Sequence, residues 1–191
     1  MRASAGSRPR PNPLASPHAL VIGGQRSGKS RVAEGMIAAT GLASVYVATA
    51  SAGDGEMAER IARHRARRGG SWRTIEEPLE LAQVLVRQAG EDTAVLVDCL
   101  TLWLSNLMSA GRSPQVEADR LTGALDQAPG PVVLVTSEVG AGIIPADEMS
   151  RRYADELGTL NQAIAAVVGQ VILVAAGQPL ILKPSRQIEA P

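Results

Sequence analysis

The feature that most restricts how this chain can fold is a glycine-rich segment of eight residues, GGQRSGKS, at positions 23–30. The segment fits the pattern G-x-x-x-x-G-K-[ST], whose glycines let successive backbone N–H groups turn inward around phosphate oxygens. An apolar run, ALVI, precedes it, and a helical pattern, KSRVAEGMIAA, follows it. A buried strand, a tight loop and a helix N-terminus must therefore follow one another, and this order predicts a phosphate-binding P-loop.

The residues of the loop and of a later strand end have distinct predicted tasks. Lys29 can reach the β- and γ-phosphates of a nucleotide, and the Ser30 hydroxyl can bind Mg²⁺. Asp98 directly follows the apolar run AVLV, so it is the candidate second metal anchor, although an Asp here can also cap the next helix. Residue 99 is Cys rather than Glu, and no N-K-x-D motif occurs. Both absences favour phosphoryl transfer to another acceptor over nucleotide hydrolysis.

Short apolar runs alternate with longer helical patterns along the chain. The predicted strands are Ala19–Ile22, Ser44–Ala48, Trp72–Ile75, Ala94–Val97, Val132–Thr136, Val171–Val174 and Leu180–Leu182. The predicted helices are Gly28–Ala39, Glu56–Arg68, Pro78–Ala89, Leu100–Ser109, Pro114–Gln127 and Asp147–Val168. Pro78 and Pro114 suit first helical turns, and Gly90 and Gly169 suit C-terminal caps. This alternation predicts a single α/β domain with a mostly parallel sheet, helices on both faces and a C-terminal hairpin strand.

The ends and the overall charge of the chain exclude several classes of protein. The domain is predicted to span residues 18–185, between a disordered tail at 1–17 and a short tail at 186–191. The first tail lacks the continuous apolar core of a signal peptide, and the rest carries 16 basic and 19 acidic residues, a net charge of −3. That balance argues against a dedicated nucleic-acid binder. A single cysteine, Cys99, excludes an internal disulfide, and no apolar run reaches the roughly 20 residues that span a bilayer, so we expect a cytoplasmic protein.

Five arginines and one histidine lie within nine residues, RIARHRARR, at 60–68. On a helix, Arg60, His64, Arg67 and Arg68 would share one face. Clustered guanidinium groups suit phosphate binding, and their positive charge favours a neutral imidazole, which can attack phosphorus. A solvated basic helix that touches RNA or a partner would show the same pattern. The residues alone leave both interpretations open.

The loop, the histidine and the later segments together resemble the bifunctional adenosylcobinamide kinase / adenosylcobinamide-phosphate guanylyltransferase family of cobalamin biosynthesis. The resemblance covers roughly residues 19 to 183. Its segments are GGQRSGKS, VYVATA (Val45–Ala50), RIARHRARRGGSWRTIEEP (Arg60–Pro78), VLVDCLTLWLSNL (Val95–Leu107), VLVTSEVGAGIIP (Val133–Pro145), RRYADELGTLNQAIA (Arg151–Ala165) and GQPLILK. R-I-x-x-H joined to S-E-V-G-x-G-I-I-P is the specific part, because the loop alone occurs across all P-loop proteins.

The resemblance implies a RecA-like P-loop fold, a homotrimer and two reactions. ATP or GTP phosphorylates the aminopropanol hydroxyl of adenosylcobinamide, and GMP from GTP then passes to that phosphate through a covalent phosphoramidate on a histidine, here His64. Pyrophosphate is released, Mg²⁺ is expected on Ser30 and Asp98, and no organic cofactor is implied. Lys29 is the second expected catalytic residue. The implied nucleotide contacts are Gly23, Gly24, Gln25, Arg26, Ser27, Gly28, Lys29, Ser30, Ala48, Thr49, Ala50, Arg65, Ala66, Arg67, Arg68, Glu76 and Asp98.

Two other functions are compatible with parts of the sequence. A P-loop kinase of another small molecule would transfer γ-phosphate without covalent GMP. A RecA-type module that binds nucleic acid through the arginine helix would show steep salt dependence, but only 2% of the residues are aromatic and able to stack on bases.

Several further side chains allow two interpretations each. Glu138 can be a site acid or the ion-pair partner of Arg151 or Arg152. Gly140 and Gly142 suggest either a mobile loop or a simple turn. Trp72 and Trp103 can contact the corrin ring or a base, but large aromatic side chains more commonly form core or trimer contacts. Cys99 lies beside a buried strand and suits inert packing.

Overall fold

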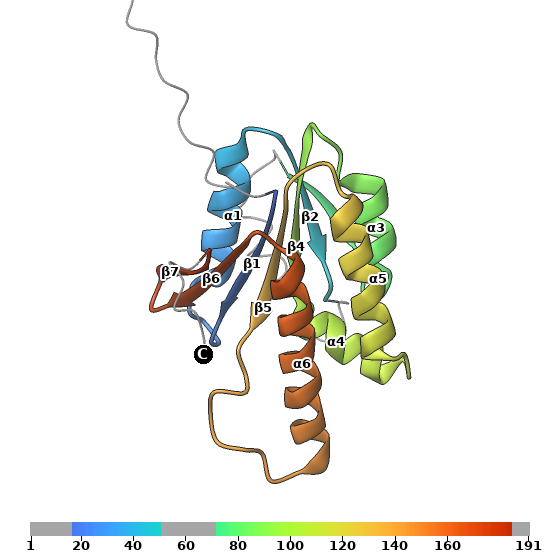
Figure 1. The fold of residues 1–191 in the computed structure, drawn as a ribbon, viewed down its shortest axis with the longest axis vertical. Coiled ribbons are helices and arrows are strands. Elements are labelled where there is room, and N and C mark those ends of the chain that lie inside the picture. The colour runs from blue at the N-terminus through green and yellow to red at the C-terminus, as the bar shows by residue number, and fades with distance from the viewer. Residues whose placement is uncertain (1–16, 51–71, 185–191) are drawn as a thin grey trace, which may run out of the picture.

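The computed structural model describes residues 17–50 and 72–184 (Figure 1). The predicted helix Glu56–Arg68, which contains His64, lies outside the described residues, and so do the C-terminal tail and almost all of the N-terminal tail.

Seven strands form one sheet in the described part of the chain, in the order β3-β2-β4-β5-β1-β6-β7. The strands are β1 (His18–Gly23), β2 (Ala43–Ala48), β3 (Trp72–Glu76), β4 (Thr93–Asp98), β5 (Val132–Ser137), β6 (Gln170–Ala175) and β7 (Gln178–Lys183). The pairs among β1 to β6 are parallel, and β7 pairs antiparallel with β6. The predicted parallel sheet and C-terminal hairpin are confirmed, and every predicted strand is present with at least one added residue.

The helices follow from clear local signals at most of their ends. They are α1 (Lys29–Thr40), α3 (Leu81–Gln88), α4 (Leu100–Ser109), α5 (Pro114–Gln127) and α6 (Glu148–Val167). α5 begins on a proline, and the Ser113 side chain caps it by accepting the N–H of Val116. Asp147 caps α6 in the same way by accepting the N–H of Ser150 at 2.8 Å. Both ends of α4 and α5 are as predicted.

Two expectations about helix ends are wrong. α3 begins at Leu81 rather than Pro78, because the Glu77 carboxylate accepts the N–H groups of Leu79 and Glu80 at 2.9 Å each and holds a bend there. Gly90 and Gly169 are not left-handed caps, since α3 and α6 have Ala89 and Val168 at their C-caps and neither glycine has a positive φ.

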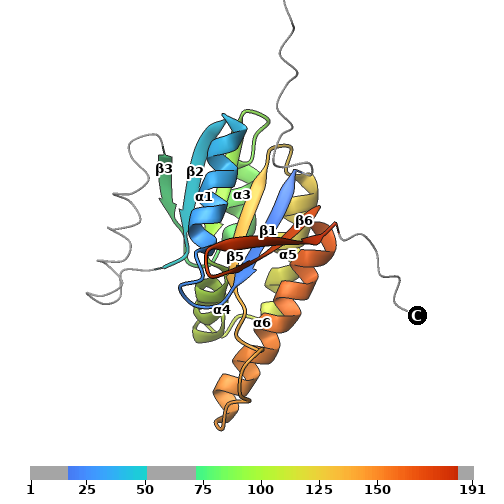
Figure 2. The same ribbon diagram turned by 90° about the vertical axis from the view of Figure 1, so that its left-hand side faces the viewer.

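Helices cover both faces of the sheet, as predicted (Figure 1, Figure 2). α1 lies alone, among the described helices, on one face, and α3, α4, α5 and α6 lie on the other. Two apolar cores result. The core under α1 is formed by Val21, Leu96 and Val135 with Ala33 and Ile37. The opposite core is larger and contains Val47, Val97, Leu134, Trp103, Leu104, Leu121 and Leu160.

Trp103 packs in the larger core, which confirms the core contact expected for it. Its side chain is buried, and Nε1–H donates to the carbonyl of Leu79 at 2.8 Å. Among the described residues, none of the helices has the length and apolarity that crossing a membrane requires.

Candidate active site

The predicted P-loop connects the end of β1 to the start of α1. The Ser27 N–H donates to the Gly24 carbonyl at 3.3 Å, which closes a tight turn. Gly28 is the N-cap of α1 with φ of 97°, and Arg26 also has a positive φ of 55°. The first turn of α1 contains no acidic residue, so its N–H groups and positive dipole end are available to an anion. The sequence and the local geometry agree on a phosphate cradle.

Two other segments hold this loop in place. The β6–β7 turn lies against it, since Gly177 N–H donates to the Ser27 carbonyl at 2.8 Å. A Cβ on Gly28 would lie 3.1 Å from the Cα of Gly177, and a Cβ on Gly23 would lie 2.4 Å from the carbonyl oxygen of Val174. The end of β5 contributes as well, because Glu138 N–H donates to the Gly23 carbonyl at 3.1 Å. The two glycines are therefore needed for packing as well as for the turn.

The two most reactive loop side chains lie at the start of α1. The ammonium of Lys29 donates to the Gly24 carbonyl at 3.0 Å, so it lies over the loop that would hold the phosphates. Ser30 follows it in the first helical turn. Both residues thus lie at the P-loop, and their contacts with phosphate and Mg²⁺ stay predictions.

Asp98 ends β4 on the same edge of the sheet. Ala48 in β2 is in register with both Glu76 and Asp98, so these three predicted site residues lie side by side at the carboxyl ends of β3, β2 and β4. Leu96 packs in the core under α1, and side chains alternate along a strand, so Asp98 is on the α1 face too. Asp98 does not cap the next helix: Cys99 is the N-cap of α4, and the Asp98 carboxylate accepts the Tyr46 hydroxyl at 2.9 Å instead.

The side chain of Thr49 is buried and bonded within the protein, whereas a side-chain contact with a nucleotide would need it exposed. The residue is 0% exposed, its Oγ1 donates to the Cys99 carbonyl at 2.8 Å, and the Cys99 N–H donates back to Oγ1 at 3.0 Å. Asn106 of α4 adds a third connection by donating to the carbonyls of Thr49 and Pro78 at 2.8 and 3.1 Å. Thr49 and Asn106 thus tie together the ends of β2, β3 and β4. The only sequence signal for Asn106 is its polarity within an apolar helix.

The pKa of the Cys99 thiol depends on its burial and on the charges around it. Burial raises its pKa, Asp98 raises it further, and Lys29 opposes the rise. The thiol is therefore protonated and unreactive, in agreement with the predicted packing role.

The residues proposed to hold a metal have suitable donor atoms. Ser30 and Asp98 offer a hydroxyl and a carboxylate oxygen, the hard donors that Mg²⁺ prefers. Within residues 17–50 and 72–184, no three His, Cys, Asp or Glu side chains form a metal cluster. Mg²⁺ beside a nucleotide needs none, because phosphates and water supply its other ligands.

The loop after β5 projects beyond the carboxyl edge of the sheet together with the first turns of α6 (Figure 1). The Glu138 carboxylate accepts the Gly140 N–H at 2.7 Å, and Arg151 donates to the carbonyls of Pro145 and Ala146. The alternative ion pair between Glu138 and Arg151 or Arg152 is not found among the described contacts. Ile143 is 97% exposed in this loop.

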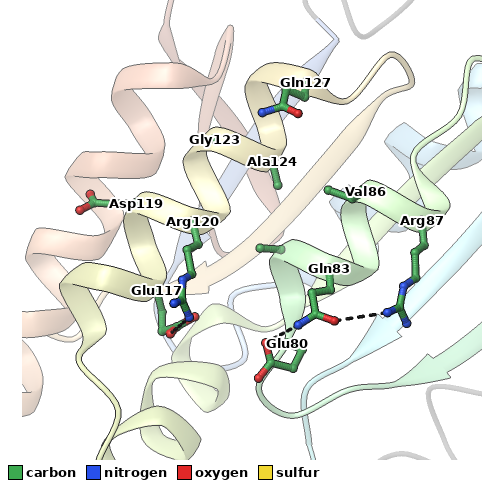
Figure 3. Close-up of a pocket in the computed structure, with 11 residues that line it drawn as sticks. Glu80, Gln83, Val86, Arg87, Glu117, Asp119, Arg120, Gly123, Ala124 and Gln127 are labelled. Carbon is green, nitrogen blue, oxygen red and sulfur yellow. Dashed lines mark hydrogen bonds and ion pairs between the residues drawn. The ribbon is translucent and has the colours of Figure 1, made fainter.

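A groove of about 640 Å³ lies between α3 and α5 (Figure 3), and no P-loop residue lines it. Glu117 is buried beside it and accepts ion pairs from Arg112 at 2.7 Å and from Arg120 at 2.8 Å. Gln83 joins Glu80 to Arg87 on the facing helix. None of the residues predicted to act in the site lines this groove.

The histidine predicted to be catalytic and the basic residues after it belong to a segment that the structure does not describe. His64 and residues 65–68 lie outside the described residues. Their segment starts after Ala50, which follows β2 on the site edge.

The fold and the loop define the class: a P-loop nucleotide-binding protein with a RecA-like α/β fold. Among solved structures, the chain is similar to the flagellar accessory protein FlaH of Methanocaldococcus jannaschii, with a TM-score of 0.51, 12% identity, and 87% of this chain and 77% of that chain covered. It is also similar to the RadB recombinase, with a TM-score of 0.50, 16% identity, and 83% and 74% of the two chains covered. At such identities the likeness concerns the fold alone.

The sequence match is far more specific. The family described as "Cobinamide kinase / cobinamide phosphate guanyltransferase" matches residues 19–182, so the chain belongs to this family. It is 51% identical over 166 residues to the "Bifunctional adenosylcobalamin biosynthesis protein CobP" of Pseudomonas aeruginosa, covering 86% of this chain and 96% of that protein. It is 36% identical over 173 residues to the "Bifunctional adenosylcobalamin biosynthesis protein CobU" of Escherichia coli, covering 83% and 95%. The predicted family and fold are confirmed.

Proposed function

We propose that this chain catalyses two consecutive transfers on a corrinoid: it phosphorylates adenosylcobinamide, and it then attaches GMP to that phosphate, giving adenosylcobinamide-GDP and pyrophosphate. The observation that carries the proposal is the family match over residues 19–182, which includes both the P-loop and His64. Relatives that this chain covers at 96% and 95% of their length are named as bifunctional. The loop geometry supports the nucleotide part independently.

The kinase half uses the described part of the site. The oxygen of the acceptor hydroxyl bonds to the γ-phosphorus and its proton passes to solvent. The bond from this phosphorus to the β–γ bridging oxygen breaks, and the nucleoside diphosphate leaves. Loop N–H groups and the Lys29 ammonium, which lies over the loop at the Gly24 carbonyl, neutralise charge on the phosphates. Ser30 and Asp98 would hold Mg²⁺, which when bound spreads the charge of the β- and γ-oxygens.

The guanylyltransferase half uses His64 as the carrier. A ring nitrogen of His64 bonds to the α-phosphorus of GTP, the α–β bridging bond breaks, and pyrophosphate leaves. An oxygen of the corrinoid phosphate then bonds to the same phosphorus, the N–P bond breaks, and His64 is restored. Arg65, Arg67 and Arg68 would hold phosphate oxygens, with Ala66 beside them. This order lets two bulky substrates react in turn at one site.

The remaining nucleotide contacts divide by their burial. Gly24, Gln25 and Arg26 are exposed in the loop, and Glu76 is exposed at the end of β3, so each is accessible to a nucleotide. Ala48 and Thr49 are buried. We therefore assign Thr49 a supporting role, and Ala48 and Ala50 a contact through the backbone.

Assembly and compartment are part of the proposal. The family resemblance supports a homotrimer. The single cysteine, which excludes an internal disulfide, supports a reducing compartment, the cytoplasm.

Product analysis tests the two activities together. The protein is incubated with Mg²⁺, adenosylcobinamide and GTP labelled at the α- or γ-phosphorus, and the corrinoids are separated. We expect γ-label in the first product. We expect γ-label and α-label, each from the correspondingly labelled GTP, in the second product, which keeps the first phosphate. The variant Lys29→Met should lose the first step. A kinase of another small molecule would label no corrinoid, and that result would refute the proposal.

A further inference from the structure

We propose that Tyr46 is a positioning residue for Asp98, and that its hydroxyl sets how tightly the site holds its divalent cation. The inference rests on the proposed function, because it takes Asp98 as a metal anchor. Neither the motif nor the family match assigns Tyr46 a role.

The contact joins two neighbouring strands at the site edge. Tyr46 lies in β2, in register with Leu96 of β4, and Asp98 is two residues further along β4 on the same face. The Tyr46 hydroxyl donates to Oδ2 of Asp98 at 2.9 Å. Among the described residues, no donor contacts Oδ1. In the described part of the chain, one carboxylate oxygen is thus held by a hydrogen bond and the other has no described donor that would compete with a cation.

The tyrosine ring is itself held rigidly. Tyr46 is 5% exposed and packs in the core under α1. Trp72 of β3 meets it edge to face, with ring centroids 6.4 Å apart and planes at 77°. Because the tyrosine ring is buried and packed against Trp72, the position of its hydroxyl is fixed. The hydrogen bond from this hydroxyl then restricts the rotation of the Asp98 carboxylate.

This arrangement has a chemical consequence for metal binding. A ligand carboxylate that is already oriented loses less rotational freedom when it binds a cation, and partners of metal ligands commonly change affinity. Tyr46 is a buried residue, and its hydroxyl donates to the proposed metal anchor rather than offering a ligand of its own. We therefore expect its effect on the cation to pass through Asp98, as a positioning residue rather than a catalytic one, and the double variant below tests this.

The chain offers a matched control for this test. It contains two tyrosines, and the other, Tyr153, is half-buried and donates its hydroxyl to the Thr101 carbonyl at 2.7 Å. Tyr46→Phe removes the hydroxyl that donates to Asp98, and Tyr153→Phe removes the hydroxyl that donates to the Thr101 carbonyl. Only the first bond ends on a proposed metal anchor.

The readout is the Mg²⁺ dependence of nucleotide binding without turnover. A fluorescent, non-hydrolysable GTP analogue is titrated with Mg²⁺ on the full-length wild type, Tyr46→Phe, Tyr153→Phe, Asp98→Asn and the double variant Tyr46→Phe/Asp98→Asn. We expect Tyr46→Phe to raise the half-saturating Mg²⁺ concentration about 10-fold, as loss of a metal ligand's partner typically does. We expect no change in Tyr153→Phe and no added effect of Tyr46→Phe in the Asp98→Asn background.

A second measurement retains Tyr46 and therefore tests the inference even if the Tyr46→Phe variant is unstable. In the Tyr153→Phe background, biosynthetic fluorotyrosine labels Tyr46 alone. We expect its ¹⁹F resonance to shift when Mg²⁺ and the nucleotide analogue are added together, and not to shift in Asp98→Asn. An unchanged Mg²⁺ dependence in folded Tyr46→Phe, an additive effect in the double variant, or an Mg²⁺-insensitive ¹⁹F signal would overturn the inference. Since no transfer is measured, failure of the proposed function would show separately in the corrinoid products.

Discussion

Replacing Thr49 by valine keeps the shape of a fully buried side chain and removes only its hydroxyl. The Oγ1 atom donates to the Cys99 carbonyl at 2.8 Å and accepts the Cys99 N–H at 3.0 Å. The carbonyl keeps a second donor, the N–H of Trp103 at 3.1 Å, so only the Cys99 N–H is left without a partner. Losing the donated bond costs about 1 kcal/mol and the unpaired N–H about 1–3 kcal/mol, so we expect the free energy of unfolding to fall by about 2–4 kcal/mol.

Urea denaturation of wild type and Thr49→Val measures this change. Thr159→Val is the matched control, because that exposed threonine donates to the Asp155 carbonyl at 3.0 Å within α6 and should change the free energy by less than about 0.5 kcal/mol. A Thr49→Val protein of unchanged stability but weaker GTP binding would refute the reasoning. It would mean that the hydroxyl contacts the nucleotide instead of the ends of β2 and β4.

Two further predictions concern the P-loop and the strand that precedes it. Gly23→Ala should abolish GTP binding and lower the melting temperature, because its Cβ would lie 2.4 Å from the Val174 carbonyl oxygen, whereas Gly24→Ala meets nothing within 4 Å and should melt like the wild type. Burial lowers the pKa of His18 below its usual value. His18 therefore binds a proton more readily in the unfolded chain than in the folded one. Its contribution to the free energy of unfolding is complete above about pH 6.5 and is lost as the pH falls below that value. Urea unfolding between about pH 7 and 5 should show a shallower pH dependence in His18→Gln than in the wild type, and equal slopes would contradict the assignment.

The strands and most helix ends could be predicted because their signals are local. Val95 and Val97 in β4 pack in one core and Leu96 in the other, so an unbroken apolar run was the correct signature of a strand covered on both faces. The Ser113–Pro114 pair marked the start of α5 for the same local reason. At α3 a carboxylate captured two backbone N–H groups and delayed the helix, and spacing of apolar residues does not show this.

The long-range contacts of the site could not be predicted. Gly177 N–H bonds to the carbonyl of Ser27, and a periodic pattern gives no information about which turn lies against which loop. The role of Thr49 depends on the register of β2 against β4, and the role of Tyr46 depends on the same pairing. Motifs identified the residues that handle phosphate, and the structure identified the residues that hold them.

Covalent labelling tests most directly whether GMP passes through His64. The protein is incubated with Mg²⁺ and GTP labelled at the α- or γ-phosphorus, without corrinoid, and is then denatured. We expect acid-labile α-label on the wild type and on His18→Gln, none on His64→Ala, and no stable γ-label on any of them. The absence of α-label from folded wild type that binds GTP would contradict the guanylyl-histidine mechanism and would leave a P-loop kinase.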